Sequence, residues 1–157
     1  MVTNSFLMKT ARQVMTRLGG GHTESVYHYA FVSMLMSAGI SSMTEVNIPY
    51  FMNGVCVGMG KADVLTQTHL IELKANQRGV QSKENAEIQL SKYLRAMHLQ
   101  GAAPRRGILI MFNTPPEGPL CDRVSFVHIS HPKAMELSGC APVKNKATRR
   151  RKLKAAH

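Results

Sequence analysis

The residues best suited to carry out a reaction in this 157-residue chain are Asp63, Glu72 and Lys74. Asp63 lies in one extended-looking segment and the other two lie in the next, with Gln67-Thr68 as a short turn between them. A two-residue turn places Asp63 directly across from Glu72 in an antiparallel pair, with Cβ atoms ~5 Å apart. Because side chains alternate along a strand, Glu72 and Lys74 share that face. The pattern predicts that the three ionisable side chains project together, and that the opposite core layer receives Val64, Ile71 and Leu73.

These residue types fit phosphodiester hydrolysis. Two opposed carboxylates repel each other and destabilise a sheet unless a cation lies between them. Mg²⁺ prefers hard oxygen ligands and is often held by one or two carboxylates, with water and substrate phosphate completing its shell. A nearby lysine can orient or help activate the attacking water and stabilise charge on the phosphate. The same spacing also fits a solvated cross-strand ion-pair cluster of Asp63 and Glu72 with Lys61 and Lys74.

Hydrophobic periodicity predicts the elements that position these side chains. Asn53-Gly54 indicates a type I′ hairpin turn, and Thr23 is expected to cap the second helix. The predicted helices span residues 5–18, 24–37 and 83–99, and the predicted strands span 44–51, 55–65, 69–75, 107–112 and 123–129. The strand 107–112 is wholly apolar, which is typical of a strand buried on both faces. The order ααβββαββ predicts a sheet with helices packed against its faces.

The charge is unevenly distributed along the chain. The formal net charge is +11, and all nine acidic residues lie at or before Glu136, whereas seven basic residues lie between Lys144 and Lys154. We therefore expect one folded domain over residues 1–136 and a basic, disordered tail over 137–157. Such a tail can contact phosphates through counterion release, serve as a nuclear-import signal, or remain solvated without a specific partner.

The cysteines and the apolar segments indicate in which cellular compartment the protein is expected. Three widely spaced cysteines predict reduced thiols rather than a disulfide framework (Cys56, Cys121 and Cys140). His128 and His131 with Cys140 do not match a zinc pattern in ligand number or spacing. The longest apolar-looking stretch, residues 29–40, is far shorter than the ~20 residues that span a bilayer, and no secretory signal is evident. We expect an intracellular protein without membrane contact, in the nucleus if the source is eukaryotic or viral and otherwise in the cytoplasm.

At these residues the sequence resembles the PD-(D/E)XK nuclease superfamily, in which an Asp and a (D/E)-x-K lie on adjacent strands. Here they read Asp63 and Glu72-Leu73-Lys74. Gly21-His22-Thr23-Glu24-Ser25-Val26-Tyr27 is similar to the signature of the GxxExxY proteins, a branch of that superfamily. Further similarity to that branch covers Ile71–Ala75, Ala86-Glu87-Ile88-Gln89-Leu90 and Tyr93-Leu94, so the resemblance extends from about Leu18 to Phe112. Ala62 replaces the usual Pro before Asp63, a position without chemistry of its own.

The resemblance implies an α/β fold with a restriction-endonuclease-like core, a central mixed β-sheet flanked by helices. It implies a nuclease that uses Mg²⁺ or Mn²⁺, with Asp63 and Glu72 as principal metal ligands, Glu24 as a helix-borne acid near the metal, and Lys74 as the catalytic lysine. Gln89 would lean over the site from a helix. From their positions alone, Glu24 also suits the N-terminal helix dipole. Gln89 also suits capping of a strand backbone group.

Basic side chains elsewhere are expected to contact phosphates, which positions a nucleic acid without reading its sequence. The expected partner is DNA rather than RNA, with structure-selective or weakly sequence-selective binding, and a homodimer is compatible with this interpretation. The candidate contacts are Arg78, Lys83, Lys92, Arg105, Arg106, Arg149, Arg150 and Arg151. Two other functions remain open: a catalytically silent nucleic-acid-binding module with the same fold, and an interaction protein whose basic tail binds an acidic partner or RNA.

Overall fold

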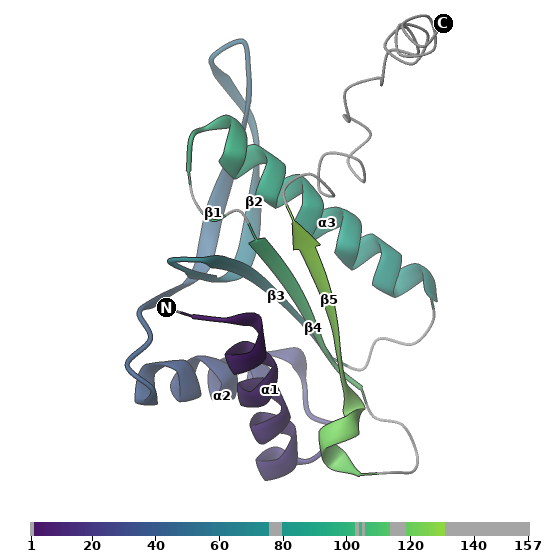
Figure 1. Ribbon diagram of the computed structural model, residues 1–157. Helices are drawn as coiled ribbons and strands as arrows, with labels where there is room; N and C mark the ends of the chain where they lie inside the picture. Colours follow the sequence, from purple (N-terminus) through teal and green to yellow (C-terminus); the bar gives the residue numbers. More distant parts are fainter. Residues whose placement is uncertain (1, 76–79, 103, 105, 114–118, 131–157) are drawn as a thin grey trace, which may run out of the picture.

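The computed structural model describes residues 2–75, 80–102, 104, 106–113 and 119–130 (Figure 1). The expected basic tail lies outside these residues. Among the described helices, none is long and apolar enough to cross a membrane. The elements are α1 (Asn4–Leu18), α2 (Glu24–Ser37), β1 (Ser42–Met52), β2 (Val55–Thr66), β3 (His69–Ala75), α3 (Val80–Leu99), β4 (Arg106–Phe112), the 3₁₀ helix η1 (Leu120–Arg123) and β5 (Val124–Ser130). The predicted order is confirmed, and η1 is an addition that the sequence pattern did not indicate.

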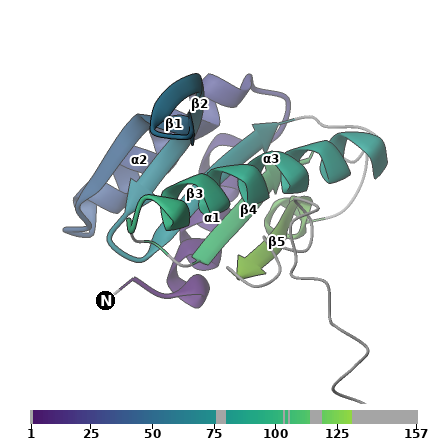
Figure 2. The same cartoon turned by 90° about the horizontal axis from the view of Figure 1, so that it is seen from above.

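The strands form one mixed sheet in the order β1-β2-β3-β4-β5. β3 and β4 are paired in parallel and are connected along the chain by the crossover helix α3. The other neighbouring strands are antiparallel. α1 and α2 cover one face of the sheet and α3 covers the other (Figure 2). The α/β fold with a central mixed sheet flanked by helices, as expected for a PD-(D/E)XK-like core, is therefore confirmed.

The first core layer lies between α1, α2 and the sheet. In α2, Tyr27, Phe31 and Leu35 recur every four residues and are fully buried, as one face of a helix requires. The Tyr27 ring stacks on Phe112 of β4, with ring centroids 4.5 Å apart. Thr23 occupies the predicted N-cap position, but its hydroxyl bonds to the Ser25 hydroxyl and makes no capping bond to the helix backbone.

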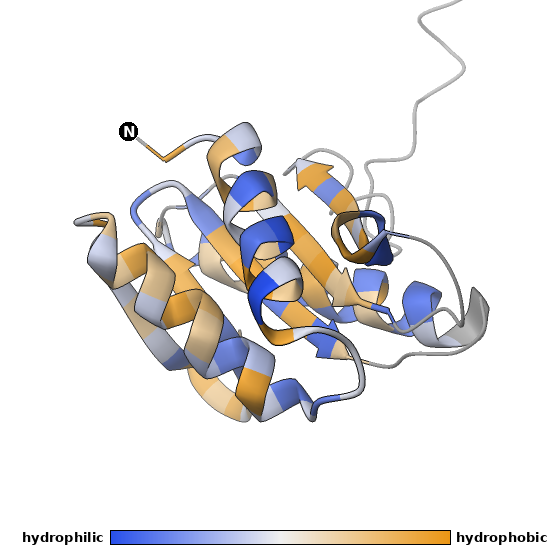
Figure 3. Cartoon of the chain, turned by 90° about the horizontal axis from the view of Figure 1, so that it is seen from below, coloured by the Kyte–Doolittle hydropathy of each residue, from blue (hydrophilic) through white to orange (hydrophobic). Residues whose placement is uncertain are grey.

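The second core layer lies between α3 and the opposite face of the sheet. It contains Leu90 and Leu94 of α3 and Leu109 of β4, all essentially inaccessible to solvent. The strands between the two layers are mainly hydrophobic (orange in Figure 3), and β4 is buried from Gly107 to Phe112. The prediction of a strand buried on both faces is confirmed.

The β1–β2 hairpin projects beyond the rest of the sheet (Figure 1). Its turn residues Asn53 and Gly54 have φ values of 50° and 80°, the left-handed conformations that a type I′ turn demands. The side of the hairpin that faces α3 is closely packed: a Cβ placed on Gly60 would lie 2.4 Å from the ring of Tyr93 and 2.7 Å from the hydroxyl of Tyr50. The absence of a side chain at Gly60 therefore allows α3 to approach β2.

Gly60→Ala is expected to lower the free energy of unfolding by about 1–3 kcal/mol, because the buried Tyr93 ring and the partly buried Tyr50 side chain must move to admit the methyl group. Gly58→Ala is the matched control on the same strand, since its Cβ would meet only Tyr50 at an ordinary 3.5 Å. Urea denaturation followed by circular dichroism measures both. Equal stability of the two variants would contradict the packing described here.

Candidate active site

The site begins where β2 stops pairing with β3. The ladder pairs Leu65 with Leu70 and Val64 with Ile71, and it ends there. Asp63 continues this register as predicted, but no backbone pair forms between it and Glu72. Instead, Asp63 Oδ2 accepts a hydrogen bond from the Leu73 N–H at 2.7 Å. The carboxylate thus takes the place of a main-chain acceptor and holds β3 while β2 turns away.

The turn in β2 is visible in the burial of its neighbours. Val64 packs in the α1–α2 core, whereas Ala62 packs in the α3 core. In a regular strand, residues two apart share a face, so β2 rotates at Asp63. Across from this point Glu45 of β1 has a φ of 52°, a conformation uncommon for residues other than glycine. The predicted placement of Val64, Ile71 and Leu73 in one core layer is confirmed.

The buried Glu72 and the partly buried Lys74 form an ion pair on the α3 side of β3. Glu72 is 1% exposed, and its Oε1 lies 2.9 Å from Lys74 Nζ. Its second oxygen, Oε2, is buried without any hydrogen-bond partner among the described residues. The interpretation of these acids as a solvated surface cluster is therefore wrong for Glu72. Lys61 does not join them, and pairs at 3.0 Å with Glu45 on the surface.

Glu24 reaches the same place from the first turn of α2. Its Oε1 lies 3.4 Å from Lys74 Nζ, and its Oε2 accepts a hydrogen bond from the Ala75 N–H at 3.2 Å. Glu24 therefore joins α2 to the end of β3 and provides Lys74 with a second carboxylate. The structure brings Glu24, Asp63, Glu72 and Lys74 together, from positions up to fifty residues apart.

The electrostatics of this cluster are dominated by burial. Burial, reinforced by the nearby Asp63, raises the pKa of Glu72 to about 7, although Lys74 opposes the shift. Burial also raises the pKa of Asp63, against the effects of the Leu73 N–H and of Lys74. For Lys74, burial alone would lower the pKa, but the neighbouring carboxylates, Glu72 first, outweigh it and raise the pKa.

A comparison with protein-family models matches residues 2–123 to the PD-(D/E)XK nuclease superfamily. The chain belongs to this superfamily. Among solved structures, it is similar to the one described as "Crystal structure of SSO0001", with a TM-score of 0.45 and 18% sequence identity over 88% of this chain and 85% of that chain. A search of curated proteins finds no significant match. The broad resemblance is thus confirmed, and the assignment to the GxxExxY branch stays a prediction.

PD-(D/E)XK nucleases are typically metal-dependent, which raises the question of whether the acids here fit a metal. In this arrangement, no three His, Cys, Asp or Glu side chains of the described residues form a group that could hold an ion. The positive charge between Glu72 and Glu24 is supplied by Lys74. The donor chemistry nevertheless suits a hard divalent cation, because Glu72 Oε2 is a buried oxygen to which no described residue hydrogen-bonds. Asp63, Glu72 and Glu24 remain the predicted ligands.

Gln89 lies on α3 and its side chain hydrogen-bonds to a tyrosine. Its side-chain amide donates to the Tyr93 hydroxyl at 2.7 Å, and the same hydroxyl accepts the Lys61 N–H at 3.4 Å. Gln89 thus reaches the backbone of β2 through Tyr93, which agrees in part with the expected capping of a strand group. Its predicted role over the site stays a prediction.

The predicted phosphate contacts are widely scattered. Lys83 and Lys92 are exposed on α3. Arg106 pairs with His69 at the start of β3, about 17 Å along the strand from Lys74, so the structure does not bring Arg106 to the acids. The other candidates, Arg78, Arg105, Arg149, Arg150 and Arg151, lie outside the described residues.

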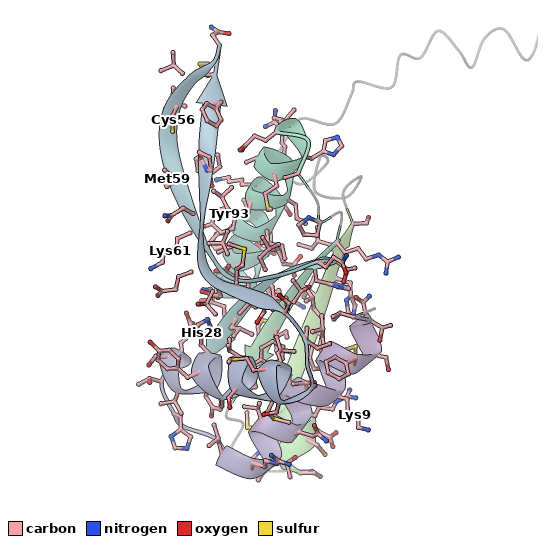
Figure 4. The ribbon with its side chains drawn as sticks, turned by 90° about the vertical axis from the view of Figure 1, so that its left-hand side faces the viewer. Lys9, His28, Cys56, Met59, Lys61 and Tyr93 are labelled. Atoms are coloured by element: carbon pink, nitrogen blue, oxygen red, sulfur yellow. The ribbon has the colours of Figure 1, made fainter. Side chains whose placement is uncertain are left out.

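Two residues near Asp63 were missed by the sequence reasoning. His28 Nε2 lies 3.2 Å from the Asp63 carbonyl oxygen (Figure 4). It follows Glu24 by four residues on the same helical face, a signal that could have found it. Glu45 carried no such signal, because its position depends on the bend in the hairpin. Both line a surface pocket of about 190 Å³ together with Glu24, Ser25, Tyr29 and Asp63.

The raised pKa of Glu72 predicts a pH-dependent penalty on stability. The folded state keeps a proton that the unfolded chain releases, so stability is full below about pH 4.5 and falls as pH rises to about 7. Glu72→Gln removes this term. Relative to the unaltered protein, the variant should gain up to about 3 kcal/mol of unfolding free energy between about pH 4.5 and pH 8. Urea denaturation in EDTA measures the difference.

The control for this experiment is Glu84→Gln, a substitution of an exposed acid on α3. Its effect on stability should not change with pH. A stability difference between Glu72→Gln and the unaltered protein that is the same at low and high pH would show that Glu72 is not buried as described.

Proposed function

We propose that this protein is a metal-dependent nuclease that hydrolyses phosphodiester bonds, with DNA as its favoured substrate, and that it belongs to the GxxExxY branch of the superfamily. The observation that carries the proposal is Glu72, a buried acid that lies beside Lys74 at the point where β2 leaves β3 and has one oxygen unpartnered by the described part of the chain. A buried carboxylate without full partners costs stability. A catalytic requirement explains why the fold carries that cost.

In this proposal three acids would bind the metal ion. Asp63 and Glu72 would hold a Mg²⁺ or Mn²⁺ ion from adjacent strands, and Glu24 would complete the set from α2. The ion would supply Lewis-acid activation of the phosphate and of the attacking water. Leu73 supports this arrangement, because its N–H orients the Asp63 carboxylate at 2.7 Å. Glu24 is oriented in the same way by the Ala75 N–H.

Lys74 acts as a cation in this proposal rather than as a base. The surrounding carboxylates raise its pKa despite its burial, so the ammonium group keeps its proton at neutral pH. Glu72 and Glu24 hold the group from two sides. From that position it stabilises the negative charge that builds on the phosphate during hydrolysis.

The expected substrate is a nucleic acid bound mainly through its backbone. The formal net charge is +11, which favours polyanions. We propose DNA over RNA and weak sequence selectivity, because the cationic side chains bind phosphates rather than base edges. The proposed domain over residues 1–136 carries the catalytic set, and the basic residues of 137–157 add phosphate affinity.

Cleavage of labelled single-stranded, duplex and branched DNA in Mg²⁺, Mn²⁺ or EDTA tests the function. The unaltered protein should cut in the presence of metal and not in EDTA. Asp63→Asn, Glu72→Gln and Lys74→Ala should each lower the rate by about 10²–10³-fold. The first two remove proposed ligands of the metal ion, and the third removes the cation that stabilises negative charge on the phosphate. The matched controls are Glu84→Gln on α3 and Lys9→Gln on α1, both of which should cut at the unaltered rate.

Retention of DNA binding without any metal-dependent cutting would contradict the proposal. That result would favour the catalytically silent binding module. A protein of that kind should bind DNA as well or better after Asp63→Asn, because the substitution removes a negative charge that faces phosphate.

Metal binding can be tested without any substrate. Mg²⁺ or Mn²⁺ at a 100-fold excess over its Kd should stabilise the folded protein by about 2.7 kcal/mol, measured as a rise in Tm. The rise should be largest above pH 7, where Glu72 releases its proton. Glu72→Gln should lose most of it, and Glu84→Gln should keep it. An equal rise in both variants would place the ion elsewhere.

A further inference from the structure

A groove lies between the outer part of the β1–β2 hairpin and the C-terminal half of α3, away from the acids. We call it the hairpin groove. Its volume is about 450 Å³, and the lining residue Gln100 joins its two sides by donating to the Pro49 carbonyl at 2.8 Å. The lining residues with chemical consequence are Tyr50, Phe51, Asn53, Lys92, Arg95 and Gln100.

The described lining of the groove carries positive charge. Lys92 and Arg95 lie one turn apart on α3, and none of the described lining residues is Asp or Glu. Within the part of the chain that the structure describes, neither cation forms an ion pair. Arg95 Nε is buried without a hydrogen-bond partner in that same part of the chain. The positive charges of Lys92 and Arg95, which are unpaired among the described residues, favour an anionic ligand in the groove.

The groove also carries an unusual amount of exposed apolar surface. Phe51 is 53% exposed, Met52 65% and Val57 60%, and Leu99 on the opposite wall is 67% exposed. Contiguous exposed apolar residues mark interaction surfaces. An exposed phenylalanine beside two cations matches the combination that binds unpaired nucleotides, in which bases stack on aromatic rings and phosphates meet positive charge.

The hairpin groove is connected to the acidic cluster through α3. Tyr93 follows Lys92 directly, and its hydroxyl accepts the Lys61 N–H at 3.4 Å. Lys61 is two residues from Asp63 on β2, a distance of about 7 Å along a strand. Figure 4 shows Tyr93 on the side of the hairpin toward α3 and Met59 on the other side. A nucleic-acid strand bound in the groove would therefore need only a few nucleotides to reach the acids.

We propose that the hairpin groove binds a single, unpaired strand of the nucleic acid, with phosphates on Lys92 and Arg95 and a base stacked on Phe51. The proposal rests on the proposed function in one respect, namely that this strand is the substrate of the acidic cluster. A duplex does not suit the groove, because its base faces are stacked inside the helix. The continuity with Asp63 favours a nucleic acid over an acidic peptide. The substrate class is thus DNA with a single-stranded segment next to the cleaved bond.

The test is binding of two fluorescein-labelled 20-mers in EDTA: oligo(dT), and an abasic strand with the same number of phosphates. Lys92→Gln and Arg95→Gln should weaken both strands, and each should reduce the slope of log K against log salt by about 0.7. Phe51→Ala should weaken oligo(dT) at least about fivefold, the lower end for the loss of one stacked base, and leave the abasic strand unchanged.

Matched controls lie outside the groove. Met59→Ala removes an equally exposed apolar side chain from the opposite side of the hairpin, and Lys9→Gln removes one charge from α1 (Figure 4). Both should bind oligo(dT) unchanged. Arg95→Lys restores the charge and should recover most of the affinity lost in Arg95→Gln, which separates an electrostatic loss from a folding defect.

Failure of this proposal and failure of the proposed function are distinguishable. Bis(4-nitrophenyl) phosphate is too small to reach the groove, so its hydrolysis in Mn²⁺ tests the acidic cluster alone: Met59→Ala and Lys9→Gln should keep the unaltered rate, and Glu72→Gln should lose it. Loss of oligo(dT) binding in Lys92→Gln and Phe51→Ala supports the groove even if the unaltered protein hydrolyses nothing. Unchanged binding, or equal weakening of both strands by Phe51→Ala, would overturn it. Displacement of oligo(dT) by poly-glutamate would point instead to an acidic protein partner, provided that Phe51→Ala weakens the binding of poly-glutamate as much as it weakens the binding of oligo(dT).

Discussion

A strand that leaves its neighbour in the middle of a sheet exposes main-chain groups that must find other partners. In this protein the partners come from side chains. The Asp63 carboxylate accepts the Leu73 N–H that a paired β2 would have satisfied, and His28 contacts the Asp63 carbonyl oxygen from α2. These contacts keep the two strands apart at a fixed place. The gap leaves room for ionisable groups, and Glu72 lies on the strand that borders it.

The same helix that completes the core also completes the site. Tyr27, Phe31 and Leu35 fasten α2 to the sheet by burial, and this places Glu24 at the end of β3. The position of Glu24 therefore depends on how Tyr27, Phe31 and Leu35 pack against the sheet. Because interiors are close-packed, a change at Phe31 would be felt at Lys74, which depends on Glu24 for one of its two carboxylate contacts.

The parts of the structure that depend on local signals could be predicted from the sequence. The Asn53-Gly54 turn, the apolar run of β4 and the four-residue spacing in α2 each specify their element directly. The opposition of Asp63 and Glu72 was predicted only in part, because the rotation of β2 depends on Glu45 and α2 rather than on the turn. Long-range packing also explains why His28 and the hairpin groove were missed. It explains as well why Arg106 was predicted to contact phosphate together with residues that lie far from it in space.

The sheet order β1-β2-β3-β4-β5 repeats the order of the strands along the chain. Neighbouring strands are therefore also consecutive in sequence, and the β3–β4 pair is separated by the long helix α3. Such local topologies lower the entropy lost in closing loops and speed folding. Asp63, Glu72 and Lys74 belong to a single tight hairpin, so most of the acidic cluster can assemble by closure of a two-residue turn. Glu24, fifty residues from Lys74, completes it only when α2 docks.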